Sequence, residues 1–276
     1  MRGQCMAGGA AMARSGSEDT LAQGSFVRVL RAEALKSRHG APVRLAIVLA
    51  LPFPLLAAFV ALSVPQFGLS YSPWNYWYAL LMPVSITLIA ATVANADARL
   101  GNHTLLSSGV PLHLAWGAKV AWCLALLLLS NLVVFAVYAV MSFVVPQGAA
   151  SMSAMLAVAL ALTVMGSWMI PATHFLTMRV GMLAGVFVPL AVQLALSLGW
   201  SVVPFWPACP PAATIVLPTA FLPVLPSGEP ASPGMALVES ISQGPDVALA
   251  LIVAAVLTAA LTAAGAVWLD RSEELR

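Results

Sequence analysis

Charged side chains are the scarcest class of residue in this chain. Asp, Glu, Lys and Arg make up 8% of the 276 residues, and hydrophobic residues make up 61%. A soluble domain carries roughly 25% charged residues, so the composition excludes an ordinary water-soluble domain. The length is better divided into spans of about 20 apolar residues than into globular domains.

Residues that carry catalysis or bind metals are also scarce. Cys5, Cys123 and Cys209 fall in a predicted tail, span and loop, which predicts no disulfide. His103 and His113 share a loop with Asp97, but their spacing matches no metal template. HExxH, GxSxG and GxxxxGK[ST] motifs are absent. We therefore predict no catalytic residue, metal or bound cofactor, and no ATP hydrolysis by this chain alone.

Ionisable residues are missing from the interior of the predicted spans. Ion-coupled transporters need such groups at depth, so ion-coupled pumping is disfavoured. Asn131, Gln193 and His174 are the polar exceptions. We expect Asn131 and Gln193 to form hydrogen bonds between helices, and His174 to be a structural or interfacial residue.

Long apolar runs predict an all-α membrane protein with six transmembrane helices. In lipid every backbone polar group must be bonded within its own segment, which favours helices. The six spans are expected at about 43–64, 77–95, 120–145, 152–173, 180–202 and 247–269. The first run begins behind a long polar lead, so no cleavable signal peptide is expected. Pro52, Pro54 and Pro83 interrupt the first two spans, and Pro171 is expected to end or kink the fourth.

The distribution of Lys and Arg predicts the orientation of these spans. The twelve basic residues fall in the N-terminal tail, in the loops after spans two and four, and in the C-terminal tail. Segments 65–76, 146–151 and 204–246 contain none. By the positive-inside rule both termini are expected in the cytoplasm.

The N-terminal region divides into two parts. Residues 1–24 are rich in Gly, Ala and Ser and are predicted to be disordered. Residues 25–38 read SFVRVLRAEALKSR, with apolar residues near helical spacing and charged residues on the opposite side. This pattern predicts an amphipathic helix in the membrane interface; the alternative is a solvated helix packed on a partner. Its marker residues are Phe26, Leu30, Arg31, Glu33 and Lys36.

The loop at 96–119 stands out because it is polar at its ends and apolar within. It carries both charge signs together with the runs LL, VPL and LAW. Such a loop on the cytoplasmic side is expected to contact a soluble partner; the alternative is a plain solvated connection. The outer loop, 203–246, is rich in proline, which forbids a long helix, and its only charges are acidic.

Four stretches of the sequence resemble a known family. They are FVRVLRAEALKSRHGAPVRLAIVLALP, WNYWYALLMP, ANADARLGNHTLLSSGVPLHLAWGAK and FWPACPPAATIVLPTAFLPVLPSGEP. In order and spacing they are similar to motifs of the membrane subunits of type-2 ABC exporters, and especially to lantibiotic self-immunity permeases of the MutE/EpiE/MutG kind. The resemblance covers residues 25–276, which are then one permease domain.

This resemblance implies a function and partners. It implies a bacterial plasma-membrane permease that pairs with a second permease subunit, the same or paralogous, and with a homodimeric ATP-binding subunit that binds ATP. It implies export of a lantibiotic or similar cationic peptide, and no nucleic acid. The alternatives are a permease for another hydrophobic substrate, such as a drug or a lipid, and a non-transporting membrane sensor or assembly protein.

Two sets of site residues follow from the resemblance and the predicted topology. The ATPase-coupling loop is expected to act through Asp97, Arg99, Leu105, Leu106, Val110, Pro111 and Lys119. Outer contacts to a peptide are expected from Trp74, Tyr76, Trp77, Trp206, Glu229 and Glu239, because aromatic rings can take its apolar side and carboxylates its lysines.

Overall fold

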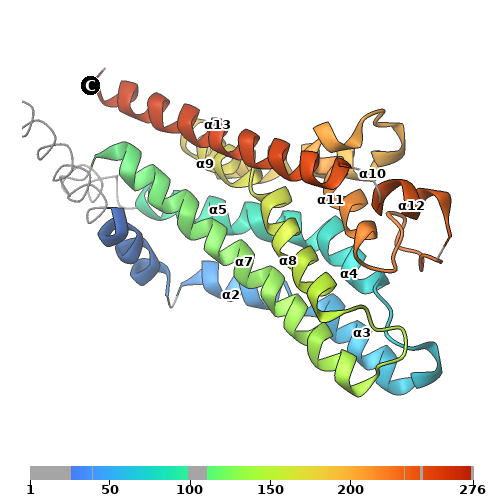
Figure 1. Cartoon of the computed structure of the whole chain (residues 1–276). Helices are drawn as coiled ribbons and strands as arrows, with labels where there is room; N and C mark the ends of the chain where they lie inside the picture. Colours follow the sequence, from blue (N-terminus) through green and yellow to red (C-terminus); the bar gives the residue numbers. More distant parts are fainter. Residues whose placement is uncertain (1–25, 39, 99–110, 233, 243–244, 275–276) are drawn as a thin grey trace, which may run out of the picture.

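The chain folds into an elongated bundle of helices (Figure 1). The computed structural model describes residues 26–38, 40–98, 111–232, 234–242 and 245–274. Within these ranges the only β pairing is an isolated antiparallel bridge between Val224 and Pro230. The prediction of an all-helical chain is confirmed for the described residues.

A short helix at 26–37 precedes the bundle. The helices that follow are α2 (Ala41–Val48), α3 (Pro52–Ser63), α4 (Ser72–Tyr76), α5 (Met82–Ala98), α7 (Leu112–Val144), α8 (Met152–Gly166), α9 (Met169–Arg179), α10 (Met182–Leu198), α11 (Pro210–Val216), α12 (Ala236–Ser242) and α13 (Asp246–Glu274). A π-helical turn, Trp77–Leu81, joins α4 to α5 without a break.

Within the described ranges, five helical stretches are long and apolar enough to cross a membrane. They are Ala41–Ser63, Ser72–Ala96, Leu112–Val144, Met152–Arg179 and Asp246–Arg271. The predicted fifth span is the shorter apolar helix α10, with 17 residues. The structure therefore supports a multi-pass membrane protein, and the count of six crossings depends on α10.

Prolines account for the irregularities inside three of these stretches. The first stretch is interrupted before Pro52, where α2 gives way to α3. The fourth is interrupted after Gly166, and Pro171 lies in the first turn of α9, where its missing N–H is tolerated. Pro83 cannot donate to the carbonyl of Ala79, and the π-helical turn lies directly before it.

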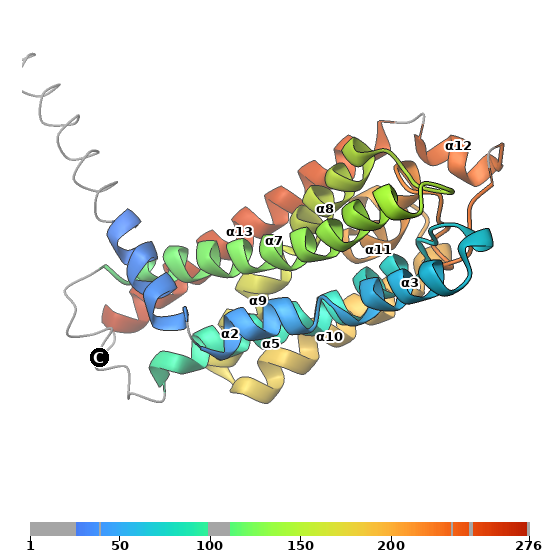
Figure 2. The same cartoon turned by 90° about the horizontal axis from the view of Figure 1, so that it is seen from below.

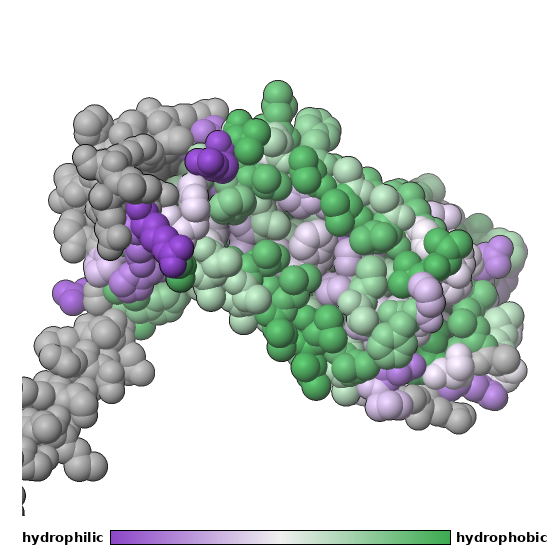
Figure 3. All heavy atoms as spheres, turned by 90° about the horizontal axis from the view of Figure 1, so that it is seen from above, coloured by the Kyte–Doolittle hydropathy of each residue, from purple (hydrophilic) through white to green (hydrophobic). Residues whose placement is uncertain are grey.

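The bundle has two distinct ends. One end carries helix 26–37, the last turn of α5, the first turn of α7, the α9–α10 turn and the end of α13 (Figures 1 and 2). The other end carries the α3–α4 and α7–α8 turns with α11 and α12. Between them the visible surface is largely apolar, with polar residues gathered toward the ends (Figure 3). An apolar belt between polar ends is the arrangement that a bilayer requires.

Three aromatic rings pack against one another at the end of the bundle that holds the α7–α8 turn. The ring of Tyr138 lies 4.6 Å from that of Trp74 and 5.2 Å from that of Tyr71. The Tyr71 hydroxyl accepts a hydrogen bond from the Ala150 amide at 2.7 Å and donates to the Met155 sulfur at 3.5 Å. Burial raises the pKa of Tyr71, and the Ala150 hydrogen bond opposes that rise. The neutral hydroxyl thus ties α4 to the start of α8.

Helices α9 and α10 form a close hairpin around Gly185. A Cβ at this position would lie 2.9 Å from the Thr177 amide nitrogen and 3.0 Å from the Thr173 carbonyl oxygen, and closer still to the Thr177 hydroxyl. Gly181 in the turn has φ of +122°, which L side chains rarely adopt. Small residues at such contacts let membrane helices approach backbone to backbone.

Candidate functional site

Helix 26–37 packs on the first turns of α7, at the end of the bundle that also holds the end of α13 (Figure 2). Phe26 and Leu30 are half-buried, whereas Glu33 and Ser37 are buried. Phe26 covers Gly117 of α7, where an added Cβ would lie 3.6 Å from its ring. The helix predicted at 25–38 is therefore present, and its bundle side includes two polar residues.

The orientation of this helix differs from the expected one. The sequence pattern places Glu33 with the basic residues on the polar side, and Val27 and Leu35 with the apolar residues. In the structure Glu33 faces the bundle, while Val27 and Leu35 are 62% and 59% exposed. The reason is Lys119, which is buried in α7 and requires an opposite charge beside it.

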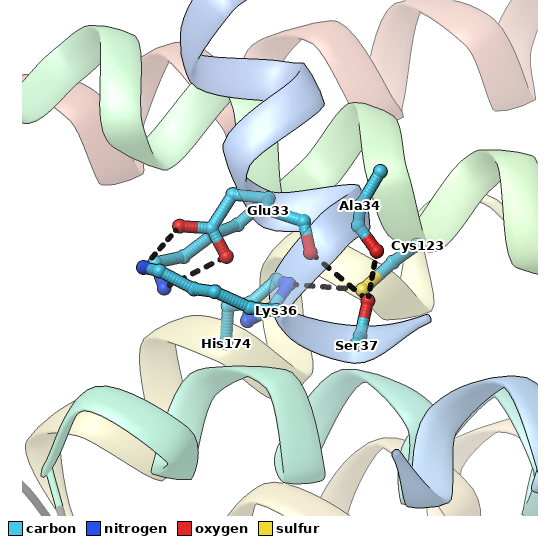
Figure 4. Close-up of polar contacts among 7 residues, drawn as sticks. Glu33, Ala34, Lys36, Ser37, Cys123 and His174 are labelled. Carbon is cyan, nitrogen blue, oxygen red and sulfur yellow. Dashed lines mark hydrogen bonds and ion pairs between the residues drawn. The ribbon is translucent and has the colours of Figure 1, made fainter. Parts of the chain in front are cut away.

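Glu33 is the centre of a three-residue ion-pair cluster (Figure 4). Its Oε2 lies 3.7 Å from the Lys119 Nζ, and its Oε1 accepts a hydrogen bond from the Lys36 Nζ at 2.9 Å. The Glu33 and Lys119 side chains are 8% and 6% exposed, whereas that of Lys36 is 48% exposed. A buried carboxylate and a buried ammonium thus face each other between helix 26–37 and α7.

Burial makes this pair important for holding the two helices together. Taking a charge out of water is unfavourable unless another charge compensates it. Removing one partner of a buried pair typically costs about 3–5 kcal/mol, because the other charge stays buried. Helix 26–37 is therefore held on α7 by the ion pair as well as by Phe26.

A second buried contact lies one helical turn further along α7. The Cys123 sulfur is 3.5 Å from the His174 Nε2, and both side chains are buried (Figure 4). The His174 ring is tilted against that of Trp116 at 5.8 Å, and its Nδ1 has no hydrogen-bond partner among the described residues. These contacts join α7 to α9 directly behind the ion pair.

Trp116 extends the same cluster to α13. Its indole N–H donates to the Thr262 carbonyl at 3.0 Å, and its ring leaves no room for a Cβ at Gly265. At the surface the His113 Nδ1 lies 3.5 Å from the Asp270 carboxylate. We call Glu33, Lys119, Trp116, Cys123 and His174 the inner cluster; it connects helix 26–37, α7, α9 and α13.

The inner cluster consists of contacts between helices. In the described part of the chain, no group of three His, Cys, Asp or Glu side chains could hold a metal ion. Among the described residues the His174 Nδ1 has no hydrogen-bond partner, whereas a nucleophile–base pair is oriented by a third group. The inner cluster is therefore described by its contacts: an ion pair to helix 26–37, a Cys–His contact to α9 and an indole hydrogen bond to α13.

The predicted coupling loop is only partly described. Arg99, Leu105, Leu106 and Val110 lie outside the described residues, and Asp97 is in the last turn of α5. Pro111 is exposed and caps the start of α7. Lys119 belongs to α7, which begins at Leu112, so the loop is shorter than the predicted 96–119. Because Glu33 compensates the charge of Lys119, α7 can include this lysine and begin before the apolar run.

The predicted outer contacts are not all on the surface. Trp74 and Trp77 are fully buried. The Trp77 indole donates to the Asn131 Oδ1 at 3.1 Å, and the Asn131 amide donates to the Thr163 hydroxyl at 3.1 Å. The expected interhelical role of Asn131 is therefore confirmed, and both tryptophans pack inside the protein rather than facing a substrate.

Tyr76 and the turn before Glu229 lie together at the end of the bundle that holds α11 and α12. Tyr76 is 46% exposed, and a Cβ at Gly228 would be 3.8 Å from its ring. The turn is held by Asn75, whose amide donates to the Leu225 carbonyl at 3.3 Å. Glu229 is exposed on this turn, Glu239 is exposed on α12, and Trp206 is half-buried.

Sequence reasoning missed the inner cluster as a unit. Glu33, Lys119 and His174 each have a separate expected role, and no motif links residues so far apart in the chain. One signal in the sequence is Lys119, which directly precedes a long apolar run. A lysine at such a position needs an opposite charge beside it. No family model, curated protein or solved structure matches this chain.

Proposed function

We propose that this chain is the membrane-spanning permease subunit of an ATP-driven ABC exporter in a bacterial plasma membrane. The proposal draws on the four sequence stretches that resemble type-2 ABC permeases. The structural observation that supports it best is the inner cluster. It ties the amphipathic helix to α7, and α7 begins directly after the segment proposed to contact an ATPase.

The proposed topology has six crossings with both termini in the cytoplasm. Helix α10 would be the fifth crossing; at 1.5 Å per residue its 17 residues span about 25 Å. It runs from the end that holds the α9–α10 turn toward the end that holds α11 (Figure 1). The end with helix 26–37 would face the cytoplasm, because the exposed residues Arg31, Arg38 and Arg179 belong to it.

The proposed energy source is a separate ATP-binding subunit, working as a dimer beneath a pair of permeases. It would dock on the segment that contains Arg99, Leu105, Leu106 and Val110, with Asp97 and Pro111 at its edges. Closure of the ATPase dimer would push this segment. The push would reach α5 and α7 directly, and helix 26–37 through Glu33 and Lys119.

The proposed substrate is a cationic amphipathic peptide such as a lantibiotic, taken from the outer leaflet. Tyr76 and Glu229 support this, because an exposed aromatic ring and a carboxylate lie on adjoining segments at the outer end. The alternative is export of another hydrophobic substrate, such as a drug or a lipid. It is favoured by the burial of Trp74 and Trp77, which leaves fewer aromatic contacts for a peptide.

A resistance assay tests the proposed function. The chain is expressed in a sensitive bacterium together with an ATPase from a neighbouring reading frame, and growth is measured against a panel of cationic peptides and hydrophobic drugs. We expect the inhibitory concentration of at least one peptide to rise several-fold, and only with an ATPase whose phosphate-binding lysine is intact. No rise for any peptide would contradict the peptide proposal, whereas a rise for drugs alone would support the alternative.

A further inference from the structure

The outward face of helix 26–37 carries basic and apolar side chains together. Val27, Arg31, Leu35 and Arg38 follow one another at intervals of four, four and three residues, and all four are exposed. Such spacing places them in one stripe along a helix. This stripe is opposite to the side that packs on α7.

The outward face has no acidic residue of its own. Glu33 is the only acidic residue in 26–38, and it faces inward, where it pairs with Lys119 and Lys36. Because Glu33 is part of the inner cluster, the outward face carries no negative charge. Its net charge is positive and comes from Arg31 and Arg38. Arg44, exposed at the start of the first membrane-length stretch, adds a further positive charge nearby.

The short connection between helix 26–37 and the first membrane-length stretch determines the depth of this helix relative to a membrane. Only residues 38–40 separate it from Ala41, where the first membrane-length stretch begins. Ile47 and Val48, just inside that stretch, are exposed as lipid-facing residues would be. The helix must then lie at the level of the headgroups.

We propose that the outward face of helix 26–37 binds anionic phospholipid headgroups. Arg31 and Arg38 would form charge-assisted hydrogen bonds to lipid phosphates, and Val27 and Leu35 would insert among the upper acyl chains. Basic residues on an amphipathic helix at a membrane surface attract anionic lipids. This inference requires a membrane-embedded chain but no ATPase partner, so it stands apart from the proposed function.

The test is a lipid titration of the full purified chain in a neutral detergent, followed by native mass spectrometry. Phosphatidylglycerol and phosphatidylcholine are compared on the wild type, on Arg31→Gln/Arg38→Gln and on Arg179→Gln/Arg271→Gln. The last variant removes two exposed arginines from the same end of the bundle and is the matched control. We expect the first variant to bind phosphatidylglycerol about tenfold more weakly, and the control to bind it like the wild type.

Several outcomes would overturn the proposal. Unchanged binding by Arg31→Gln/Arg38→Gln would show that these arginines do not hold the lipid. An equal loss in the control would assign the effect to net charge, and competition by soluble glycerol phosphate at lipid-like concentrations would indicate a free-anion site. Should the first variant not fold, the wild type decides: its binding of phosphatidylglycerol must weaken as salt rises from about 0.05 to 0.5 M. Binding that is independent of salt overturns the proposal.

Discussion

Among single residues, Glu33 links helix 26–37 to α7 by an ion pair. One carboxylate faces two lysines, and both Glu33 and Lys119 are buried between helix 26–37 and α7. We expect Glu33→Gln to destabilise the protein by about 3 kcal/mol, because the buried Lys119 ammonium loses an opposite charge. The measurement is the thermal unfolding midpoint in detergent.

The companion variants separate the ion pair from other effects. Lys119→Met should be milder than Glu33→Gln, because Glu33 keeps its hydrogen bond from Lys36. The double variant Glu33→Gln/Lys119→Met should recover part of the loss, since no buried charge faces a neutral group. Glu229→Gln, in an exposed turn, is the control and should leave the midpoint unchanged. A Glu33→Gln protein as stable as the wild type would show that the pair does not hold the helix.

At the scale of elements, the α9–α10 hairpin depends on one glycine. A Cβ at Gly185 would collide with the Thr177 backbone and hydroxyl, so Gly185→Ala must push α10 away from α9. We expect a loss of about 1–3 kcal/mol, as for overpacking of a close-packed core. Gly117→Ala is the matched control: its Cβ would meet only the Phe26 ring at 3.6 Å, and alanine favours the helix.

The measurement is the thermal unfolding midpoint of Gly185→Ala and of Gly117→Ala under the same conditions. If Gly185→Ala unfolds at the same temperature as Gly117→Ala, the close approach of α9 and α10 is wrong. The same comparison bears on the count of crossings, because α10 is the shortest of the proposed spans and packs on α9 and α5.

Hydropathy and proline positions predicted most of the elements. The apolar runs gave the long helices, and Pro52 and Pro171 lie at the two interrupted stretches, because proline lacks the N–H that a helix interior needs. The start of α7 was placed eight residues too late. Lys119 looked like the last residue of a loop, since a charge is unfavourable in an apolar helix, and its partner Glu33 belongs to another helix.

The candidate site was harder to predict than the helices for a related reason. Hydropathy reports which residues avoid water, but not which of them meet after folding. Glu33, Lys119 and His174 are separated by long stretches of chain and belong to three helices. Likewise, the buried rings of Trp74 and Trp77 look like interfacial residues in sequence, because tryptophan is common at both the membrane surface and the helix core.

At the scale of the whole molecule, the two ends of the bundle differ in character. The described arginines are at or near the end that holds helix 26–37, while Glu229, Glu239 and Tyr76 are exposed at the opposite end. The inner cluster joins four helices at the basic end, and the stacked rings of Tyr71, Trp74 and Tyr138 join others at the far end. Side-chain contacts thus hold several helices together at each end of the bundle.

Co-purification tests the proposed docking of an ATPase at the end of the bundle that holds helix 26–37. The tagged chain is expressed with the ATPase from a neighbouring reading frame and purified from membranes. Asp97→Lys/Leu105→Glu changes the proposed docking segment, whereas Glu239→Lys/Leu237→Glu makes the same chemical changes on α12 at the other end. We expect only the first variant to lose the ATPase, and both variants to insert normally into the membrane. An ATPase retained by Asp97→Lys/Leu105→Glu at the wild-type ratio would contradict it.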